Sequence, residues 1–188
     1  MGRWEPNARG RLERAALELY VEHGFEQTTV AKITERAGLT ERTFFRHFAD
    51  KREVLFAGSG AMRELCVAAV AAAPDSATPL DMVAAALDAA SARWEERGET
   101  VRKRQTVIDA NAELRERELI KLAALSTALA DAMRRRGVAE LTARLTAETG
   151  IVVLKVAFER WIGDPGQRSL PQLIKECLNA LGTMTGSR

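Results

Sequence analysis

The chain has 188 residues and a mass of 20.6 kDa, with 46% hydrophobic residues, 29% charged residues and a formal charge of +2. This composition excludes a mostly disordered chain and suffices for one large or two small domains that fold without covalent crosslinks. The two cysteines, Cys66 and Cys177, lie far apart and outside any CxxC spacing, which argues against a disulfide framework and a zinc ribbon.

Helix is the dominant expected structure. The chain contains 32 alanines but only 5 prolines and 1 tyrosine, so its summed helix propensity is high. No long stretch alternates with the period of two that a half-buried strand requires. We expect an all-α fold of about nine helices, with a compact N-terminal domain over residues 1–56 and a larger helical bundle over residues 57–188.

The first two helices are bounded by glycine and threonine. Apolar residues at helical spacing line one face of the first helix: Leu12, Ala16, Leu19 and Tyr20. Gly24 closes this helix, because glycine readily takes the left-handed conformation that follows a helix C-terminus. The second helix begins after the pair Thr28-Thr29, which offers an N-cap hydroxyl, and ends at Gly38.

Capping signals place the later helix starts. A third helix is expected to begin after Thr40, and a fourth at Asp50, which resembles a capping box with Glu53. We expect the fourth helix to continue through the Gly-Ser-Gly segment at 58–60, as a lever that an effector pushes from the C-terminal bundle. Further breaks are expected at residues 73–79, near 98, 111 and 137, and at 163–166. A second capping box, Ser169 with Gln172, opens the last helix.

The segment Ala37-Gly38-Leu39-Thr40 joins two short helices as in a helix-turn-helix motif, because the tight turn needs glycine and the next helix needs an immediate cap. The helix after this turn has two different faces. One face holds Phe44, Phe48 and Glu41 and is expected to be buried, whereas the other holds Arg42, Thr43, Arg46 and His47. A recognition helix needs one such face for packing and another for base edges and phosphates in the major groove.

Charge placement, rather than net charge, favours nucleic acid as the partner of this helix. Residues 1–56 contain 10 Lys and Arg against 9 Asp and Glu, so an ordinary solvated face is the alternative reading. Lys51 and Arg52, however, follow the Asp50 cap, where a cation opposes the helix macrodipole. A cation is favourable there when it binds a phosphate together with the free N–H groups of the helix.

Several of these segments occur together: Thr28-Thr29-Val30 with Ile33, then Ala37-Gly38-Leu39, then Thr43-Phe44-Phe45-Arg46-His47-Phe48 followed by Lys51 and Leu55. This combination, within residues 9–56, resembles the DNA-binding domain of the tetracycline-repressor (TetR) family. Residues 102–117 are similar to an actinobacterial-type subgroup of that family. The resemblance implies a ligand-responsive homodimeric repressor whose last two helices form a four-helix dimer interface.

The resemblance also implies which residues contact DNA. The expected DNA-binding residues are Thr29, Val30, Thr40, Glu41, Arg42, Thr43, Phe45, Arg46, His47 and Lys51. Thr43, Phe45, His47 and Lys51 match family positions that contact the DNA backbone, and Arg42 and Arg46 lie on the face that reads bases or adjacent phosphates. Phe45 departs from the usual tyrosine and lacks its hydroxyl, so packing or contact with a thymine methyl is its alternative role.

The C-terminal helices supply candidates for dimerisation and for a ligand. The expected dimer interface consists of Leu154, Phe158, Trp161, Ile174, Cys177, Leu178 and Leu181, with a monomer core as the alternative. The expected ligand-binding residues are Met62, Leu65, Cys66, Leu87, Trp94 and Phe158. Residues 102–104, Arg-Lys-Arg, are a candidate site for an anionic head group, and residues 134–136, Arg-Arg-Arg, are interpreted as compensating the dipole of a surface helix at its C-terminus.

Other function classes have less support. His23 and His47 are the only histidines, so no catalytic residue, metal site or cofactor is expected. The N-terminal segment lacks the apolar stretch of a signal peptide, and the longest apolar run, residues 65–73, is about half a membrane span, so a cytoplasmic protein is expected. We expect a homodimeric transcriptional repressor that binds double-stranded operator DNA and is released by a small, largely apolar effector. The alternative is an all-α protein-binding adaptor or ligand carrier that does not bind DNA.

Overall fold

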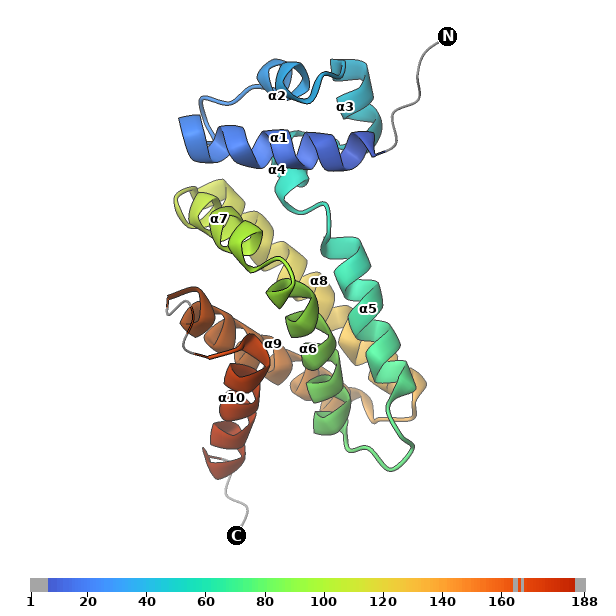
Figure 1. Cartoon of the computed structure of the whole chain (residues 1–188). Helices are drawn as coiled ribbons and strands as arrows, with labels where there is room; N and C mark the ends of the chain where they lie inside the picture. The colour runs from blue at the N-terminus through green and yellow to red at the C-terminus, as the bar shows by residue number, and fades with distance from the viewer. Residues whose placement is uncertain (1–6, 164–165, 167, 185–188) are drawn as a thin grey trace. The chain divides into compact units, whose positions relative to one another are not determined.

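The computed structural model describes residues 7–163, 166 and 168–184, and within these ranges the chain forms ten α-helices (Figure 1). The expected all-α fold is confirmed. The expectations for residues 1–6 and for the centre of the break at 163–166 lie outside the described residues. Within the described ranges, no helix is both long enough and apolar enough to cross a membrane.

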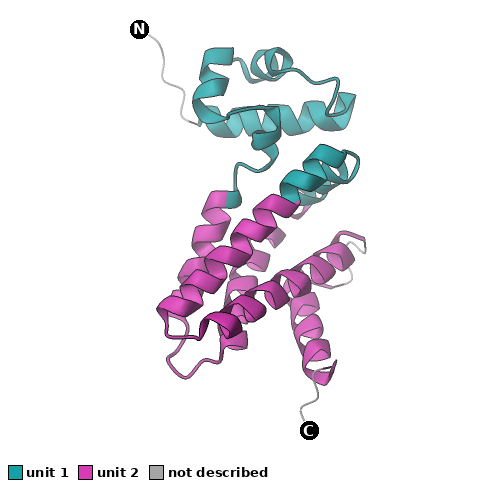
Figure 2. Ribbon diagram, turned by 180° about the vertical axis from the view of Figure 1, so that it is seen from behind, with its two compact units in different colours: residues 1–59, 99–118 teal, residues 60–98, 119–188 magenta. Residues whose placement is uncertain are grey.

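The helices form two compact units (Figure 2). Unit 1 comprises the chain up to residue 59 together with residues 99–118, and unit 2 comprises residues 60–98 and those from 119 onward. This division differs from the expected one, in which residues 57–188 formed a single domain. The physical reason is that Val107, Ile108 and Leu114 are buried in the same hydrophobic core as the first helices.

Three helices at the start of unit 1 follow the local signals of the sequence: α1 (Ala8–His23), α2 (Val30–Ala37) and α3 (Glu41–His47). Gly24 ends α1 with φ 82°, and Gly38 ends α2 with φ 62°, both in the left-handed region. The hydroxyls of Thr29 and Thr40 cap α2 and α3 by accepting hydrogen bonds from backbone N–H groups three residues later. Each of these expected helix ends is confirmed.

The fourth helix, α4 (Lys51–Leu55), is much shorter than expected. It ends at Leu55, and α5 (Ser59–Ala72) begins separately, so the prediction of one helix through the Gly-Ser-Gly segment is wrong. Phe56 lies in the core of unit 1, and Gly58 has a low helix propensity. The chain therefore turns after α4 to bury Phe56, and no single rigid helix acts as a lever through this segment.

Helix α7 (Gly98–Asp109) and the first turns of α8 (Ala112–Arg135) complete unit 1, and the boundary between the units falls inside α8. Arg104 of α7 fixes this segment to the turn after α4. Its Nε donates to the backbone oxygen of Leu55 at 2.6 Å, and its guanidinium lies 4.9 Å from the ring centroid of Phe56. Lys103 forms an ion pair with Glu99 at 2.7 Å. Two of the three cations proposed for an anionic head group are thus engaged within unit 1.

Unit 2 contains α5, α6 (Pro79–Glu95), the remainder of α8, α9 (Glu140–Gly163) and α10 (Leu170–Met184). The predicted capping box of α10 is confirmed: the Ser169 backbone N–H donates to Gln172 Oε1 at 3.0 Å, and the Gln172 backbone N–H donates to Ser169 Oγ at 3.3 Å. The breaks predicted at 73–79 and near 98, 111 and 137 are confirmed as well.

The arginine run at 134–136 serves two helix ends: Arg134 and Arg135 lie in the last turn of α8, as expected for compensation of its dipole, and Arg136 follows that helix. Arg134 pairs with Asp131 on its own helix, whereas Arg136 reaches α5. The Arg136 guanidinium donates to the backbone oxygens of Val70 and Pro74, each at 3.0 Å, and to that of Ala73. The last carbonyls of a helix have no partner within it, so Arg136 compensates the C-terminus of α5.

Candidate nucleic-acid interface

Helix α3 presents two chemically distinct faces. Phe44 and Phe48 belong to the core of unit 1, with 0% and 4% exposure. The exposed side chains are Glu41, Arg42, Phe45 and Arg46, and those of Thr43 and His47 are partly buried. The expectation that Glu41 lies on the buried face is wrong, because its side chain is exposed. Glu41 is in the first turn of α3, where a carboxylate is favourable at the positive end of the helix dipole.

The turn before α3 requires glycine because the backbone of Gly38 has a positive φ. A Cβ added there would also lie 2.9 Å from a guanidinium nitrogen of Arg11, at the flexible end of that side chain. That guanidinium donates to the backbone oxygen of Ala37, the residue just before Gly38. The backbone N–H of Leu39 donates to the oxygen of Thr34 at 2.8 Å and completes the turn. The N-termini of α2 and α3 are therefore held in a fixed arrangement on α1.

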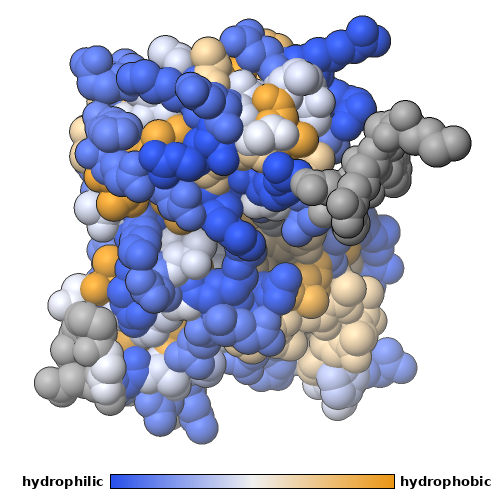
Figure 3. Space-filling view, turned by 45° about the horizontal axis from the view of Figure 1, so that its top comes forward, coloured by the Kyte–Doolittle hydropathy of each residue, from blue (hydrophilic) through white to orange (hydrophobic). Residues whose placement is uncertain are grey.

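The surface around this motif is mostly hydrophilic. In Figure 3, which brings the N-terminal helices forward, isolated hydrophobic side chains interrupt a largely hydrophilic surface. Phe45 is the most exposed aromatic residue of α3, at 56%. An exposed phenyl ring between Arg42 and Arg46 suits contact with a thymine methyl or a sugar.

The threonine and histidine side chains among the predicted DNA contacts are partly engaged within the protein. Thr40 Oγ1 and Thr43 Oγ1 lie 3.1 Å apart and share a hydrogen bond, and Thr40 Oγ1 also caps the helix. Thr29 Oγ1 accepts the Lys32 backbone N–H at 3.3 Å. His47 Nε2 is buried without a hydrogen-bond partner, so a contact from this side chain to the DNA backbone requires Nδ1 or a rotation of the ring.

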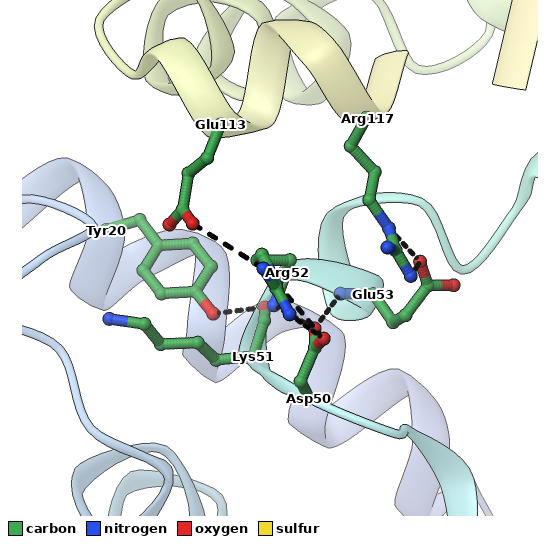
Figure 4. Close-up of polar contacts among 7 residues, drawn as sticks. All are labelled: Tyr20, Asp50, Lys51, Arg52, Glu53, Glu113 and Arg117. Carbon is green, nitrogen blue, oxygen red and sulfur yellow. Dashed lines mark hydrogen bonds and ion pairs between the residues drawn. The ribbon is translucent and has the colours of Figure 1, made fainter. Parts of the chain in front are cut away.

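The start of α4 does not offer the anion site expected from the sequence. The Asp50 carboxylate accepts the backbone N–H groups of Arg52 at 2.8 Å and Glu53 at 3.0 Å, which occupies the donors that a phosphate would need. The Lys51 ammonium points away from Asp50 (Figure 4) and donates to the backbone oxygens of Phe25 at 2.9 Å and Thr28 at 3.1 Å. The Lys51 ammonium thus has hydrogen-bond partners within unit 1, and its contact with a DNA phosphate stays a prediction.

Burial and hydrogen bonding act in opposite directions on Asp50. Burial raises the pKa of this carboxyl, but the hydrogen bonds from the Arg52 guanidinium and from the backbone N–H of Glu53 outweigh it. The pKa of Asp50 is therefore below its usual value, and the carboxylate stays charged while it caps α4.

Two ion pairs that sequence reasoning missed connect α4 with the start of α8 (Figure 4). Arg52 lies 3.6 Å from a carboxylate oxygen of Glu113, and Arg117 pairs with Glu53. Glu113 and Arg117 are four residues apart and therefore lie on one face of α8. This spacing indicates that both can contact the same neighbouring helix, but not which helix it is. Their partners lie about sixty residues earlier, so periodicity alone could not identify them.

Unit 2 brings together only some of the predicted ligand-binding residues. The rings of Trp94 and Phe158 are 5.2 Å apart, between α6 and α9. Cys66 and Leu87 are fully buried, and the Cys66 thiol donates to the backbone oxygen of Ala86 at 3.6 Å. Burial raises the pKa of Cys66 to about 11, as expected for a core thiol. Met62 is partly buried and Leu65 is exposed, both on α5.

The residues predicted to form the dimer interface also fall into two groups, buried and partly exposed. Leu154, Trp161 and Ile174 are buried within one protomer, which corrects their assignment to a surface between copies. Phe158, Cys177, Leu178 and Leu181 remain partly exposed. The sequence reasoning missed an exposed apolar stripe on α9, formed by Leu141, Leu145, Val152 and Val156. Its spacing of four, seven and four residues places all four side chains on one side of the helix.

Known proteins resemble this chain along most of its length. A family model described as bacterial regulatory proteins, tetR family, matches residues 13–57, and one described as the MftR C-terminal domain matches residues 77–185. The HTH-type transcriptional regulator TcmR of Streptomyces glaucescens is 41% identical over 85 residues, which are 45% of this chain and 38% of that protein. The match thus spans well under half of TcmR.

Solved structures share the fold. The SmeT–triclosan complex, of the Stenotrophomonas maltophilia repressor, matches with a TM-score of 0.66 and 22% identity, over 92% of this chain and 90% of that chain. FadR of Bacillus subtilis, in complex with stearoyl-CoA, matches with a TM-score of 0.65 and 20% identity, over 92% and 96%. Because the MftR-type model covers more than half of the sequence and the tetR model covers the helix-turn-helix, the chain belongs to the TetR family of bacterial regulatory proteins.

Proposed function

We propose that this protein is a DNA-binding transcriptional repressor that docks α3 in the major groove of its operator. The observation that carries the proposal is the division of α3 into a buried face with Phe44 and Phe48 and an exposed face with Arg42, Phe45 and Arg46. Arginine makes bidentate hydrogen bonds to guanine, and an exposed phenyl ring suits a thymine methyl. Family membership supports the same function.

Most of the remaining predicted DNA contacts lie at the starts of α2 and α3. Thr29 and Val30 lie at the start of α2, and Thr40, Glu41 and Thr43 lie at the start of α3. Helix N-termini and short hydroxyl side chains commonly contact phosphates, so we assign the threonines to the DNA backbone through their hydroxyls and Val30 and Glu41 through their backbone N–H groups. His47, through Nδ1, and Lys51 remain candidates for contacts with the DNA backbone.

The operator-bound form is proposed to be a homodimer. A helix-turn-helix dimer reads two half-sites about 34–36 Å apart, one turn of DNA. We place the contact on the exposed stripe of α9 defined above, with the partly exposed Cys177, Leu178 and Leu181 of α10 beside it. An isologous interface places each copy of such a stripe against its equivalent, and this removes its apolar side chains from water.

Release is proposed to follow binding of a small, largely apolar effector to unit 2. The ligands of SmeT and FadR, triclosan and stearoyl-CoA, both have large apolar parts. In this chain the aromatic pair Trp94–Phe158 is the strongest candidate contact for such a molecule. Coupling between sites is reciprocal, so an effector that weakens DNA binding must itself bind more weakly in the presence of the operator.

The experiment that tests DNA binding is selection of genomic fragments by the purified protein, followed by sequencing. The expected result is enrichment of a short sequence with two-fold symmetry, whose affinity falls steeply as salt is raised. A protein-binding adaptor or a ligand carrier would enrich no sequence at any salt concentration, and that result would overturn the proposal. The genes beside the enriched fragments would also narrow the choice of effector.

A further inference from the structure

We infer that Glu113 and Arg117, at the start of α8, are positioning residues for operator binding, because they hold α4 in place within unit 1. Their role rests on the proposed DNA-binding function. It accounts for part of a segment, residues 102–117, from which no DNA contact is expected. Neither residue touches DNA in this arrangement; each acts through α4.

The charges of α4 and α8 are complementary in their order (Figure 4). On α4 a cation, Arg52, is followed directly by an acid, Glu53, whereas on α8 the acid, Glu113, comes first and the cation, Arg117, one turn later. Arg52 lies 3.6 Å from a carboxylate oxygen of Glu113. The Arg117 guanidinium donates to the Glu53 carboxylate. Exchanging the two charges on either helix would bring like charges together, so this order favours one placement of α4.

The pair of Glu53 with Arg117 is the stronger of the two. Its side chains are 22% and 32% exposed, against 40% for Arg52 and 43% for Glu113. Water and salt screen an ion pair less as its exposure falls. Arg52 also has a second partner, because its guanidinium lies 2.6 Å from the Asp50 carboxylate. We therefore expect Arg117 to contribute more than Glu113 to the placement of α4.

The far end of α4 is held from the same part of unit 1. The Nε of Arg104, on α7, donates to the backbone oxygen of Leu55, the last residue of α4, at 2.6 Å. The Arg104 guanidinium in turn lies 3.5 Å from a carboxylate oxygen of Glu118. The Gln105 amide donates to that carboxylate at 3.2 Å. Residues 104–118 thus contact α4 in its first turn and at its last residue.

The remaining contacts of α4 reach a different side of the helix. The Tyr20 hydroxyl of α1 donates to the backbone oxygen of Lys51 at 2.6 Å, and Val54 and Leu55 are buried in the core. A helix of five residues is too short to be stable by itself, so tertiary contacts determine where it lies. The ion pairs with α8 act on the partly exposed side chains at 52 and 53, on the face that the core does not hold.

The position of α4 matters for DNA because only three residues separate it from α3. Lys51, the first residue of α4, and His47, the last of α3, are both candidates for contacts with the DNA backbone. Phosphate contacts fix the register of a protein on the duplex while the recognition helix reads the bases, so both sets of contacts must form together. A displaced α4 would place Lys51 wrongly relative to α3.

Neutralising the two acids tests the inference, because positioning and simple electrostatics predict opposite signs. Glu53→Gln and Glu113→Gln each remove a negative charge, which alone would strengthen binding to polyanionic DNA. We expect each variant instead to weaken operator binding, by about two- to fivefold per half-site for a partly exposed ion pair. Glu116→Gln makes the same charge change at an exposed position of α8 and should not weaken binding. Unchanged or tighter binding by a variant would overturn the role of the pair to which it belongs.

Charge exchange at Glu53 and Arg117 provides the second test. Arg117→Glu and Glu53→Arg should each weaken operator binding, the latter although it adds positive charge, because like charges then meet. The double variant has the wild-type net charge and should recover part of the loss. Recovery is incomplete because an arginine in the first turn of α4 opposes the helix dipole. Tighter binding caused by Glu53→Arg in both backgrounds would indicate simple attraction to DNA and overturn the inference.

Thermal denaturation separates positioning from stability. Affinities are measured well below the melting temperature of every variant, so that only folded protein is compared. A lowered melting temperature with unchanged operator affinity would assign the ion pairs to stability alone and overturn the inference. If the charge-reversed variants do not fold, the two glutamine variants decide. A wild type that binds no DNA would refute the proposed function, whereas a wild type that binds DNA and unaffected variants would refute only the role of Glu113 and Arg117.

Discussion

Phe44 and Phe45 are neighbours in α3 with opposite surroundings: Phe44 is fully buried, and Phe45 is 56% exposed. Helical geometry alone separates them, since successive side chains point about 100° apart. The Phe45 ring meets the ring of Phe44 edge to face, with the centroids 5.4 Å apart, and its exposed part is available for contact with a thymine methyl. Arg42 and Arg46, which are also exposed, lie beside it on the same helix.

Replacing Arg42 by alanine tests base reading on this face. We expect Arg42→Ala to cost about 1–3 kcal/mol of operator affinity and to relax preference at one base pair, because a bidentate contact to a base would be lost. Fluorescence anisotropy on operators with single base changes measures both effects. Arg63→Ala, which removes an exposed arginine from α5, is the control. Equal weakening on every operator variant would assign Arg42 to phosphates instead.

At this scale the sequence predicted the faces of α3, except for Glu41, and the capping residues, because both depend on neighbours within a few positions. It could not predict the direction of the Lys51 side chain. The oxygens that bind its ammonium belong to a loop more than twenty residues earlier, and no local pattern indicates that this loop passes beside α4. The ion pair between Glu53 and Arg117 was missed for the same reason.

Helix α4 is only five residues long and depends on its cap. Asp50→Ala should lower the free energy of unfolding by about 1–2 kcal/mol at neutral pH, since two backbone N–H groups lose their acceptor. Chemical denaturation measures this, with Glu64→Ala on the exposed side of α5 as control.

The effect of Asp50→Ala should depend on pH. Because the pKa of Asp50 is lowered in the folded protein, its contribution is fully present above the ordinary aspartate pKa of about 4 and is lost as pH falls through the lowered value. The difference between wild type and variant should therefore shrink in acid. A difference that stays constant from pH 7 down to strongly acid solution would contradict the capping role of the charge.

Gly150 allows α9 to pack closely on α6. A Cβ added at Gly150 would lie 2.4 Å from Cγ1 of Val83, which is fully buried. Gly150→Ala should therefore destabilise the protein by about 1–3 kcal/mol through overpacking, although alanine favours helix more than glycine does. Adding Val83→Ala should recover part of this loss in thermal denaturation. A higher melting temperature for Gly150→Ala alone would contradict the close packing of α9 on α6 at this position.

Most helix boundaries were predictable at the element scale, because proline, glycine and capping hydroxyls act locally. The break between α4 and α5 was not, because it depends on burial of Phe56 in a core built from distant segments. Arg136 is similar: the sequence indicated a cation that compensates a helix C-terminus, but the helix is α5, more than sixty residues earlier.

The proposed homodimer is tested at the scale of the whole molecule. Wild type should have about twice the mass of a 20.6 kDa chain by light scattering at micromolar concentration. Val152→Glu with Val156→Glu should give folded monomers, because charges on the exposed stripe of α9 oppose burial there. Trp161 is unsuitable for this test, since a charge in its buried position would disrupt the protomer. A variant that remains dimeric would place the interface elsewhere.

The all-α class and the presence of two units could be predicted from the sequence, but the membership of unit 1 could not. Val107, Ile108 and Leu114 follow a helical pattern that suits any apolar core. Only the folded chain shows that this core is the one beneath the helix-turn-helix. The ligand-binding residues were ambiguous for a similar reason, because Cys66 and Leu87 in a core have the same spacing as residues that line a cavity.

Because unit 1 is assembled from two separate stretches of chain, it cannot be transplanted as one continuous piece. A chimera joined at residue 56 would exchange Phe44 and Phe48 but keep Val107, Ile108 and Leu114 from the original protein, so the new core would combine two unmatched halves. An operator-specificity graft must carry residues 99–118 together with the N-terminal segment. The same topology predicts the outcome of proteolytic cleavage between α5 and α6. The N-terminal fragment, which carries the helix-turn-helix, would stay bound to the C-terminal fragment, because the core of unit 1 contains residues from both.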